Sequence, residues 1–225
     1  MARMHIAISG ATGTGKTTLA EGFRGLPGVG VVDEPQPRAL LAQFSHEPRS
    51  HCFALQEQII LGRASNARKQ ADADVLIFDR TLAEDVAVFL ALHRGCGFLT
   101  DEQVDHLGMV AAALTAEIGT PDVHVVLSAD GEVLRTRVRN AHAPEPVLSS
   151  LDTQIDLYMR WIRQLSGPTI TIDTSHIEAN ILRRTCAWIL DTAPLAAARG
   201  FVEQSAQGMQ WDRGGQDDIE SAERD

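Results

Sequence analysis

Gly10-Ala11-Thr12-Gly13-Thr14-Gly15-Lys16-Thr17 is the most informative stretch of this sequence, because it reads G-x-x-x-x-G-K-[ST], the pattern of a phosphate-binding loop. A short, largely apolar run at 5–8 precedes it, as expected of a buried strand. After it, Leu19 and Phe23 are four residues apart, which places both on one face of a helix. Because strand, loop and helix occur in the required order, the motif predicts a protein that binds a nucleoside triphosphate.

The loop also predicts how the triphosphate is held. Its glycines let backbone N–H groups turn inward, where they meet the positive end of the helix dipole and form an anion site. Lys16 is expected to reach the β- and γ-phosphates, and the Thr17 hydroxyl is expected to ligate Mg²⁺ that arrives with ATP or another triphosphate. The predicted cofactor-binding residues of the loop are Gly10, Ala11, Thr12, Gly13, Thr14, Gly15, Lys16, Thr17 and Thr18.

Composition limits the possible classes of protein. The 225 residues suit one domain of ordinary size, and the net charge of −10 argues against nucleic acid as a partner. No stretch is apolar enough to span a membrane, and the N-terminus has no signal-peptide pattern, so we expect no membrane partner. The cysteines, Cys52, Cys96 and Cys186, are odd in number and widely spaced, which is typical of reduced thiols in a cytoplasmic protein.

The C-terminal segment differs in composition from the rest of the chain. Positions 201–225 contain seven acidic residues against only Arg213 and Arg224. We therefore predict a domain over 1–200, followed by an acidic, disordered tail over 201–225. Met209 and Trp211 leave the alternative that the tail is a docking segment.

Strand and helix patterns alternate along the domain. Five short apolar runs bounded by turn or charged residues predict strands, at 5–9, 29–33, 75–79, 123–127 and 169–173. Segments with a period of 3.6 residues predict helices at about 16–25, 36–45, 50–71, 81–94, 101–118, 130–142, 148–166 and 176–191. This alternation predicts an α/β fold with three layers, α/β/α, around a five-stranded parallel sheet. Ligands of such sheets bind beyond the carboxyl ends of the strands.

The third predicted strand ends in an acid followed by an arginine. Asp79 fits a carboxylate that acts on Mg²⁺ directly or through water, and Arg80 fits a group that stabilises charge on a transferring phosphoryl group. The alternative for Asp79 is a cap on the next helix. The second strand ends at Glu34-Pro35, which emerges at the same edge as Lys16, so that Glu34 could accept a proton from an attacking hydroxyl. The alternative for Glu34 is an acid that simply begins a turn.

Further motifs extend this pattern to a known family. The chain resembles the deoxynucleoside kinases, and in particular the bacterial deoxyadenosine/deoxyguanosine kinases, over about 4–190. The resemblance rests on the order and approximate spacing of Glu34-Pro35, Phe44, Pro48, Phe53, Gln56, Arg63, Asp79-Arg80-Thr81 and Asp85. It implies a P-loop kinase fold and transfer of phosphate from ATP to the 5′-hydroxyl of a deoxynucleoside.

The resemblance also implies roles for individual residues. Glu34 is the general base, Arg80 contacts the reacting phosphate, and Asp79 works with the metal. Gln56 hydrogen-bonds the nucleobase edge, and Arg63 and Asp85 form a second polar pair near the base, a combination that implies a purine nucleoside or deoxycytidine. The spacing is compatible, because Gln56 and Arg63 are seven residues apart on one helix face. The alternatives are a solvated glutamine and an ordinary surface ion pair.

The lid that the resemblance implies, near 134–146, departs from the family pattern of R-x-x-x-R-x-R followed by Glu. Arg137 matches the first arginine and is expected to act in catalysis at the γ-phosphate with Lys16 and Arg80, but Ala141 and Ala143 stand at the other two positions. Arg135 and Arg139 are the candidates to replace them at the triphosphate. Glu145 lies near the expected acid, and His46 lies where relatives have a tyrosine that contacts the sugar.

Several alternatives remain open at this point. A nucleoside monophosphate kinase of the thymidylate kinase type would need a cationic clamp, for which Arg38 and Arg49 are available. An enzyme similar to ribosylnicotinamide kinase shares the layout, and a nucleotide-binding partner protein without transfer activity fits the thinned lid. The family implies a homodimer, which the apolar faces around 86–92 and 110–114 would suit, unless these faces belong to the core.

Overall fold

A parallel β-sheet forms the centre of the described part of the chain, which comprises residues 3–143, 145–199 and 204–205 of a computed structural model. Its strands are β1 (Met4–Ser9), β2 (Val29–Val32), β3 (Val75–Asp79), β4 (Val123–Ser128), β5 (Thr169–Asp173) and β6 (Gln204–Ser205). They lie in the order β2-β3-β1-β4-β5-β6, and every neighbouring pair is parallel. All five predicted strands are therefore confirmed, and a sixth strand of two residues extends the edge next to β5.

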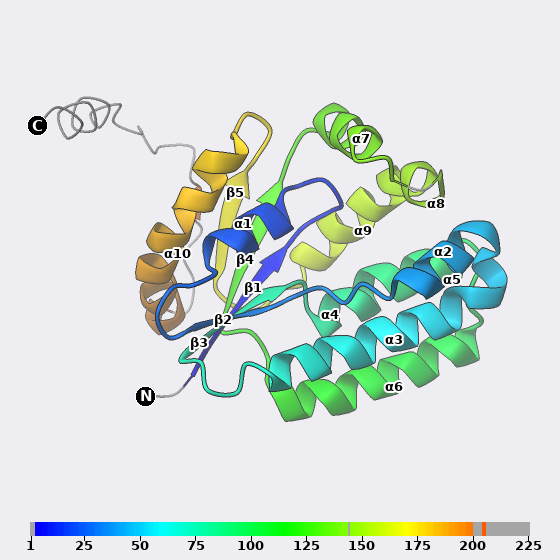
Figure 1. Ribbon diagram of the computed structural model, residues 1–225, viewed down its shortest axis with the longest axis horizontal. Helices are drawn as coiled ribbons and strands as arrows, with labels where there is room; N and C mark the ends of the chain where they lie inside the picture. The colour runs from blue at the N-terminus through cyan, green and yellow to red at the C-terminus, as the bar shows by residue number, and fades with distance from the viewer. Residues whose placement is uncertain (1–2, 144, 200–203, 206–225) are drawn as a thin grey trace, which may run out of the picture.

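Helices connect the strands and cover both faces of the sheet (Figure 1). They are α1 (Lys16–Gly22), α2 (Arg38–His46), α3 (Pro48–Arg68), α4 (Leu82–Glu84), η1 (Asp85–Leu90), α5 (Ala91–Gly95), α6 (Asp101–Ile118), α7 (Gly131–Asn140), α8 (Glu145–Ser149), α9 (Leu151–Ile162) and α10 (Ala179–Arg199). None of the helices among these described residues has an apolar stretch of the length that a membrane span requires. Apart from β6, the predicted tail at 201–225, with Met209 and Trp211, lies outside the described residues.

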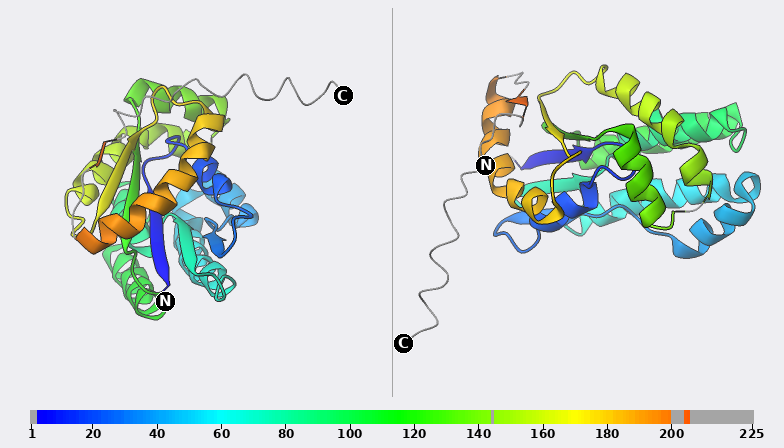
Figure 2. Two further views of the ribbon diagram at one scale, coloured as in Figure 1. Left: turned by 90° about the vertical axis from the view of Figure 1, so that its left-hand side faces the viewer. Right: turned by 90° about the horizontal axis from the view of Figure 1, so that it is seen from above.

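Alternate residues of the strands point to opposite faces and divide the core into layers. Ile6 and Ile8 of β1 pack with Phe23 after α1 and with Ile189 of α10. On the other face, Phe78 of β3 belongs to a cluster of Val32, Leu76 and Ala67 that joins the sheet to α3. Figure 2 shows the same arrangement from two further directions. The three-layer α/β/α fold is thus confirmed.

The helix predicted at 81–94 is divided into three pieces. Thr81 caps its start in a capping box, in which the Thr81 hydroxyl accepts a hydrogen bond from the backbone of Glu84 and the Glu84 carboxylate accepts one from the backbone of Thr81. The segment that follows, η1, is a π-helix, and α5 then continues as an ordinary α-helix. A π-helix carries wider i→i+5 turns and is frequent at functional sites. Elsewhere, the helix predicted at 148–166 is preceded by a separate α8, and α10 runs beyond its predicted end at 191 through Pro194.

The carboxyl ends of the parallel strands bring the informative residues to one edge of the sheet. The phosphate-binding loop follows β1, Glu34 follows β2, Arg80 follows β3 and Thr174 follows β5. At the start of the loop, Gly10 has φ 146°, and a Cβ there would lie 2.3 Å from the backbone oxygen of Leu127. Only glycine therefore allows the loop to leave β1 this close to β4.

His124 makes the stability of the fold depend on pH. Its side chain faces Trp161 of α9 with ring centroids 5.7 Å apart, its Nδ1 is buried without a hydrogen-bond partner among the described residues, and burial lowers its pKa to about 4. The unfolded chain, with a histidine pKa near 6.5, binds this proton first, so stability is complete above pH 6.5 and is lost as the pH falls towards 4. We expect a loss of about 1–3 kcal/mol from this histidine.

Urea unfolding of wild type and His124→Leu at pH 7.5 and pH 4.5 tests this expectation. The variant should lose less stability between the two pH values than wild type. His93, whose pKa burial also lowers to about 4, is present in both proteins and contributes equally to each. An identical loss in the two proteins would contradict the assignment to His124.

Candidate active site

Two cavities lie side by side beyond the carboxyl ends of the strands. The first, here called the loop cavity, has a volume of about 450 Å³ and is lined by 12–18 of the phosphate-binding loop together with Arg137 and Thr174. The second, here called the side cavity, has a volume of about 330 Å³ and lies between α2, α3 and the η1–α5 helix. Thr12, Glu34 and Arg80 line both, so the two cavities meet at these three residues.

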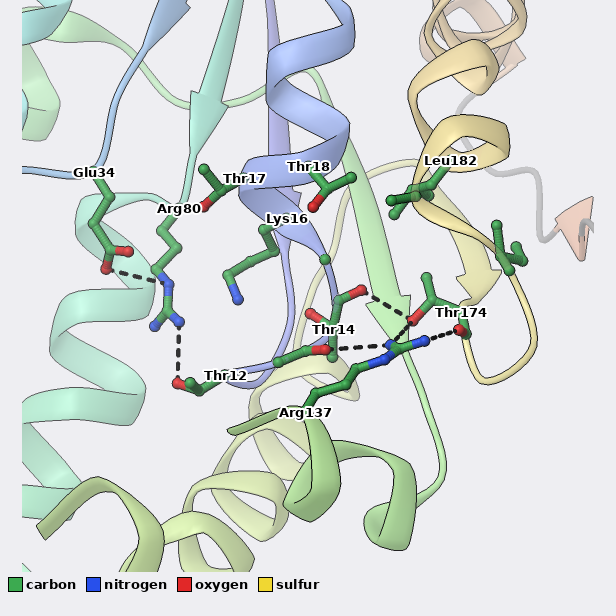
Figure 3. A pocket seen from close by; sticks show the side chains of 14 residues that line it. Thr12, Thr14, Lys16, Thr17, Thr18, Glu34, Arg80, Arg137, Thr174 and Leu182 are labelled. Atoms are coloured by element: carbon green, nitrogen blue, oxygen red, sulfur yellow. Dashed lines mark hydrogen bonds and ion pairs between the residues drawn. The ribbon is translucent and has the colours of Figure 1, made fainter. Parts of the chain in front are cut away.

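The phosphate-binding loop is closed around its own lysine. Figure 3 shows the Lys16 side chain directed into the loop cavity between Arg80 and Thr14. Its ammonium group donates to the backbone oxygen of Ala11 at 2.8 Å, and the residue is only 5% exposed. Burial, together with the charge of Arg80, lowers the pKa of Lys16 to about 7. The negative charge of a bound triphosphate would raise the pKa of Lys16 again and favour its charged form.

Thr17 and Asp79 form an oxygen-rich pair next to the lysine. The Thr17 hydroxyl donates to Asp79 Oδ2 at 2.8 Å. Asp79 Oδ1 is buried and has no hydrogen-bond partner among the described residues, and burial raises the pKa of this carboxyl group. A hydroxyl and a carboxylate oxygen without a partner are ligands that Mg²⁺ prefers, so the residues present fit a magnesium ion that is bound with the nucleotide phosphates.

Arg80 occupies the junction of the two cavities in an unusual backbone conformation. Its φ of 70° lies in the left-handed region, which is costly for a side chain other than glycine and is found mostly at functional sites. Arg80 Nε lies 3.3 Å from Glu34 Oε1 as an ion pair, without the geometry of a hydrogen bond. Burial would raise the pKa of Glu34, but the charges of Arg80, Arg63 and Lys16 lower it below its usual value. Glu34 is therefore an ionised acceptor at neutral pH.

Tyr158 and Glu84, which the sequence analysis did not assign to the site, hold Arg80 from behind. Arg80 Nη1 donates to the Tyr158 hydroxyl at 3.1 Å, and this hydroxyl donates to Glu84 Oε1 at 3.0 Å. The fully buried Glu84 also accepts from the hydroxyl of Ser9 and from the backbone of Thr81, each at 3.0 Å. The Glu84 carboxylate thereby links the end of β1, the start of α4 and helix α9.

Arg137 closes the loop cavity from the side of α7. Its guanidinium group donates to the backbone oxygens of Gly13 at 3.3 Å and Thr174 at 2.7 Å. The Thr174 hydroxyl donates in turn to the backbone oxygen of Thr14 at 2.9 Å (Figure 3). Arg137 therefore lines the loop cavity, where the sequence places it near the phosphates. Its hydrogen bonds, however, go to the backbone of the loop and of Thr174, so it also holds the loop in place.

The side cavity has mainly apolar walls with a few polar groups, as is typical of sites for small molecules. Phe44, Leu55 and Phe89 provide apolar surface, and Gln56 and Asp85 place an amide and a carboxylate beside it. The ring of Phe89 also lies 4.5 Å from the guanidinium carbon of Arg80. Of the polar residues that the resemblance assigned to the base, Gln56 and Asp85 therefore line this cavity.

Arg63 lies deeper than expected. Its side chain is fully buried, does not line the cavity, and contacts Asp85 through Nε at 2.7 Å and through Nη2 at 3.0 Å. Arg63 Nη1 donates to the backbone oxygens of Asp79 at 2.7 Å and Arg80 at 3.1 Å. The alternative of an ordinary surface ion pair is wrong, because the pair is enclosed between α3 and η1. Arg63 fixes both Asp85 and the end of β3.

Other predicted residues are not brought to either cavity. His46 and Glu145 are exposed and line neither one, although Ala143, Pro146 and Val147 around Glu145 line the side cavity. Pro144 lies outside the described residues. His46 is the last residue of α2 and Glu145 is the first residue of α8, and both side chains lie on the outer surface.

The two candidate lid arginines are also directed away from the loop cavity. Arg135 forms ion pairs with Glu132 and with Asp152 of α9, and Arg139 is exposed at the end of α7. Arg135 and Arg137 are two residues apart, a rotation of about 200° around the helix, so they lie on nearly opposite faces and Arg137 is the one that reaches the loop. Arg38 and Arg49, the clamp considered for a monophosphate acceptor, are exposed and line neither cavity.

Comparison with known proteins gives a consistent result. The sequence profile of a family described as deoxynucleoside kinase matches residues 6–185. A deoxyadenosine kinase of Dictyostelium discoideum is 27% identical over 183 residues, which cover 76% of this chain and 72% of that protein. Structures of a deoxyadenosine kinase from M. mycoides, with bound dATP and with bound dCTP, have TM-scores of 0.69 and 0.68. Each is 19% identical and covers 84% of this chain and 100% of the other, a likeness of fold.

Proposed function

Because this chain belongs to the deoxynucleoside kinase family and is thus a nucleoside kinase, a phosphotransferase, we propose that it transfers the γ-phosphate of ATP or another nucleoside triphosphate to the 5′-hydroxyl of a deoxynucleoside. The observation that carries this proposal is the junction of the two cavities at Thr12, Glu34 and Arg80. A triphosphate in the loop cavity and a nucleoside in the side cavity would meet at Glu34 and Arg80, whose carboxylate and guanidinium group lie 3.3 Å apart.

In the proposed mechanism the protein mainly positions and neutralises charge, as is usual in phosphoryl transfer. Glu34 accepts the proton of the 5′-hydroxyl, and Lys16 and Arg80 stabilise the charge on the phosphoryl oxygens. Thr17 and Asp79 would hold Mg²⁺, which supplies further neutralisation of phosphate charge when it is bound. Arg137 keeps the phosphate-binding loop in place through the carbonyl group of Gly13.

For the substrate we propose a purine deoxynucleoside or deoxycytidine. Support comes from the amide of Gln56 and the carboxylate of Asp85, which offer hydrogen bonds to a base edge inside a mainly apolar cavity. Deoxyadenosine is the named substrate of the Dictyostelium relative, and the M. mycoides kinase is described with bound dATP, dCTP and dCMP. Adenine and cytosine both carry an exocyclic amino group, which can donate a hydrogen bond to a carboxylate.

Replacement of Asp85 by asparagine is expected to change base preference more than total activity. The amide keeps the shape of the side chain but removes half of its acceptor capacity, so substrates with an exocyclic amino group should lose about 10-fold or more in kcat/KM relative to the others. Because the amide also leaves the buried Arg63 without its charge partner, the comparison is made between substrates at a temperature where the variant is folded. ADP release is measured over deoxyadenosine, deoxyguanosine, deoxycytidine, thymidine, their monophosphates and nicotinamide riboside.

Asp105→Asn, at an exposed position of α6, is the matched control and should leave the substrate profile unchanged. A profile of Asp85→Asn identical to that of wild type would reject the role of Asp85 in recognition. In wild type the same screen separates a nucleoside acceptor from a monophosphate or nicotinamide riboside acceptor.

We also propose that the enzyme is a cytoplasmic homodimer. The three cysteines are free, as is usual in a reducing compartment. Of the two faces considered for dimerisation, 86–92 has Val88, Leu90 and Leu92 buried in the core, so it offers little free surface. The second face, on α6, exposes Ala112 and Ala113 next to Met109, which is 67% exposed. We therefore propose the exposed apolar face of α6 as the dimer contact.

A further inference from the structure

His93 is a histidine at the wall of the side cavity that no part of the proposed mechanism uses. It lies on α5 and lines the cavity with its neighbours Leu92 and Cys96. Two aromatic rings enclose it, because its ring lies edge-on to Phe44 with centroids 5.4 Å apart and tilted against Phe98 at 6.2 Å. The residue is half-buried, and the part of it that these rings leave uncovered lines the cavity.

The imidazole lacks a partner within the described part of the chain. His93 Nδ1 is buried and makes no hydrogen bond to any described residue. A buried polar atom without a partner destabilises the protein, and nearly all such atoms in native proteins are paired. Nδ1 is itself closed off from the cavity, so a hydrogen bond to a ligand would be made by Nε2, which is neither buried without a partner nor hydrogen-bonded among the described residues.

The charge state of His93 indicates the chemistry of that ligand. Burial lowers its pKa to about 4, so the ring is neutral at neutral pH and offers one hydrogen-bond donor and one acceptor. A neutral ring has no particular attraction for phosphate. It suits an uncharged polar group, such as an amino or keto group of a base or a hydroxyl group of a sugar.

The position of His93 along its helix places it on the same wall of the side cavity as Asp85 and Phe89. Asp85, Phe89 and His93 follow one another at intervals of four residues, about one turn each, and all three line the cavity. Phe89 contacts Arg80 at the junction with the loop cavity. His93 lies one turn beyond Phe89 and Asp85 one turn before it, so a nucleoside that fills the side cavity lies between His93 and Asp85.

We infer that His93 is a specificity-determining residue, whose imidazole hydrogen-bonds a neutral polar group of the nucleoside in the side cavity. This inference rests on the proposed function. It also replaces the sequence-based expectation for His46, because the histidine that the fold brings to the cavity is His93. The polar group belongs either to the base or to the 3′-position of the sugar, and both sources require the same hydrogen bond.

The test combines deletion of the side chain with deletion of the substrate group. The protein variants are His93→Leu, which keeps an apolar side chain of similar size, and His93→Asn, which keeps a donor and an acceptor. His46→Leu, at an exposed position outside the cavity, is the matched control. Each full-length protein is assayed for kcat and KM with deoxyadenosine, with purine 2′-deoxyriboside, which lacks the amino group, and with 2′,3′-dideoxyadenosine, which lacks the 3′-hydroxyl.

Wild type and His46→Leu should discriminate against one of the two analogues by about 3- to 10-fold more than His93→Leu does. The change should appear mainly in KM, and His93→Asn should restore part of the discrimination. The analogue that ceases to matter in His93→Leu identifies the source of the hydrogen bond. In the absence of nucleoside, His93→Leu should unfold at the same or a higher temperature than wild type, because it removes an unpaired polar atom.

The outcomes separate this inference from the proposed function. If wild type phosphorylates deoxyadenosine but His93→Leu and His93→Asn discriminate against both analogues as wild type does, His93 has no role in recognition and the proposed function stands. If wild type phosphorylates no nucleoside, the proposed function fails and the inference fails with it. If His93→Leu does not fold, His93→Asn decides. Weaker discrimination against one analogue, at a normal unfolding temperature, supports the inference. Discrimination like that of wild type, or unfolding of both variants, overturns it.

Discussion

Replacement of Glu34 by glutamine should lower turnover by about two to four orders of magnitude and leave ATP affinity nearly unchanged. The carboxylate is ionised because Arg80, Arg63 and Lys16 lower its pKa, and it lies where the two cavities meet. Glutamine preserves the shape of the side chain but cannot accept the proton of the attacking hydroxyl. Steady-state kcat with deoxyadenosine gives the rate, and calorimetry gives the dissociation constant of ATP.

Asp33→Asn is the matched control for this prediction. Asp33 precedes Glu34 in the sequence, but its side chain is exposed and pairs with Arg24, so turnover should stay close to that of wild type. Glu34→Gln also removes the ion pair with Arg80, and ATP hydrolysis without a nucleoside reports on that effect separately. Near-normal turnover of Glu34→Gln would eliminate Glu34 as the general base.

Replacement of Arg63 by leucine is expected to reduce the free energy of unfolding by about 3–5 kcal/mol. Arg63 and Asp85 are enclosed together, so loss of the arginine leaves a buried carboxylate and the backbone oxygens of Asp79 and Arg80 without their donor. Urea denaturation measures the loss. The double variant Arg63→Leu/Asp85→Leu should recover a large part of it, since no charge then remains buried.

Arg68 provides the control on the same helix. Its ion pair with Glu117 has the same distance of 2.7 Å as that of Arg63 with Asp85, but both side chains are 51% exposed. Arg68→Leu should therefore cost far less stability than Arg63→Leu. A similarly small cost for Arg63→Leu would show that the Arg63 pair does not support the end of β3.

The sequence predicted those parts of the site that are fixed by strand ends. Lys16, Glu34 and Arg80 each follow a parallel strand, and parallel strands bring their carboxyl ends to one edge whatever the details of packing. The same rule could have found Thr174, which follows β5. Glu84 could also have been read from the sequence, because Thr81-x-x-Glu84 is a capping-box pattern.

Depth and direction of helical side chains were not predictable in this way. The spacing of Gln56 and Arg63 puts both on one face of α3, but only the packing of α3 against η1 buries Arg63 and leaves Gln56 at the cavity. Similarly, whether His46 or His93 faces the side cavity depends on how α2 lies against α5. For the lid, the sequence showed that Arg137 matched the family, but the directions of Arg135 and Arg139 depend on their ion pairs and on the end of α7.

The π-helical segment η1 contains, in effect, one residue more than an α-helix needs to span the same length. One residue of an α-helix corresponds to a rotation of about 100°, so everything after η1, including His93 and Cys96, is turned by that angle relative to an uninterrupted helix. Loss of a single codon within 85–90 would turn the outer wall of the side cavity to a different set of side chains, while Asp79 and Arg80 stayed in place. A one-residue deletion in η1 is thus expected to alter the side cavity more than a single substitution in its wall would.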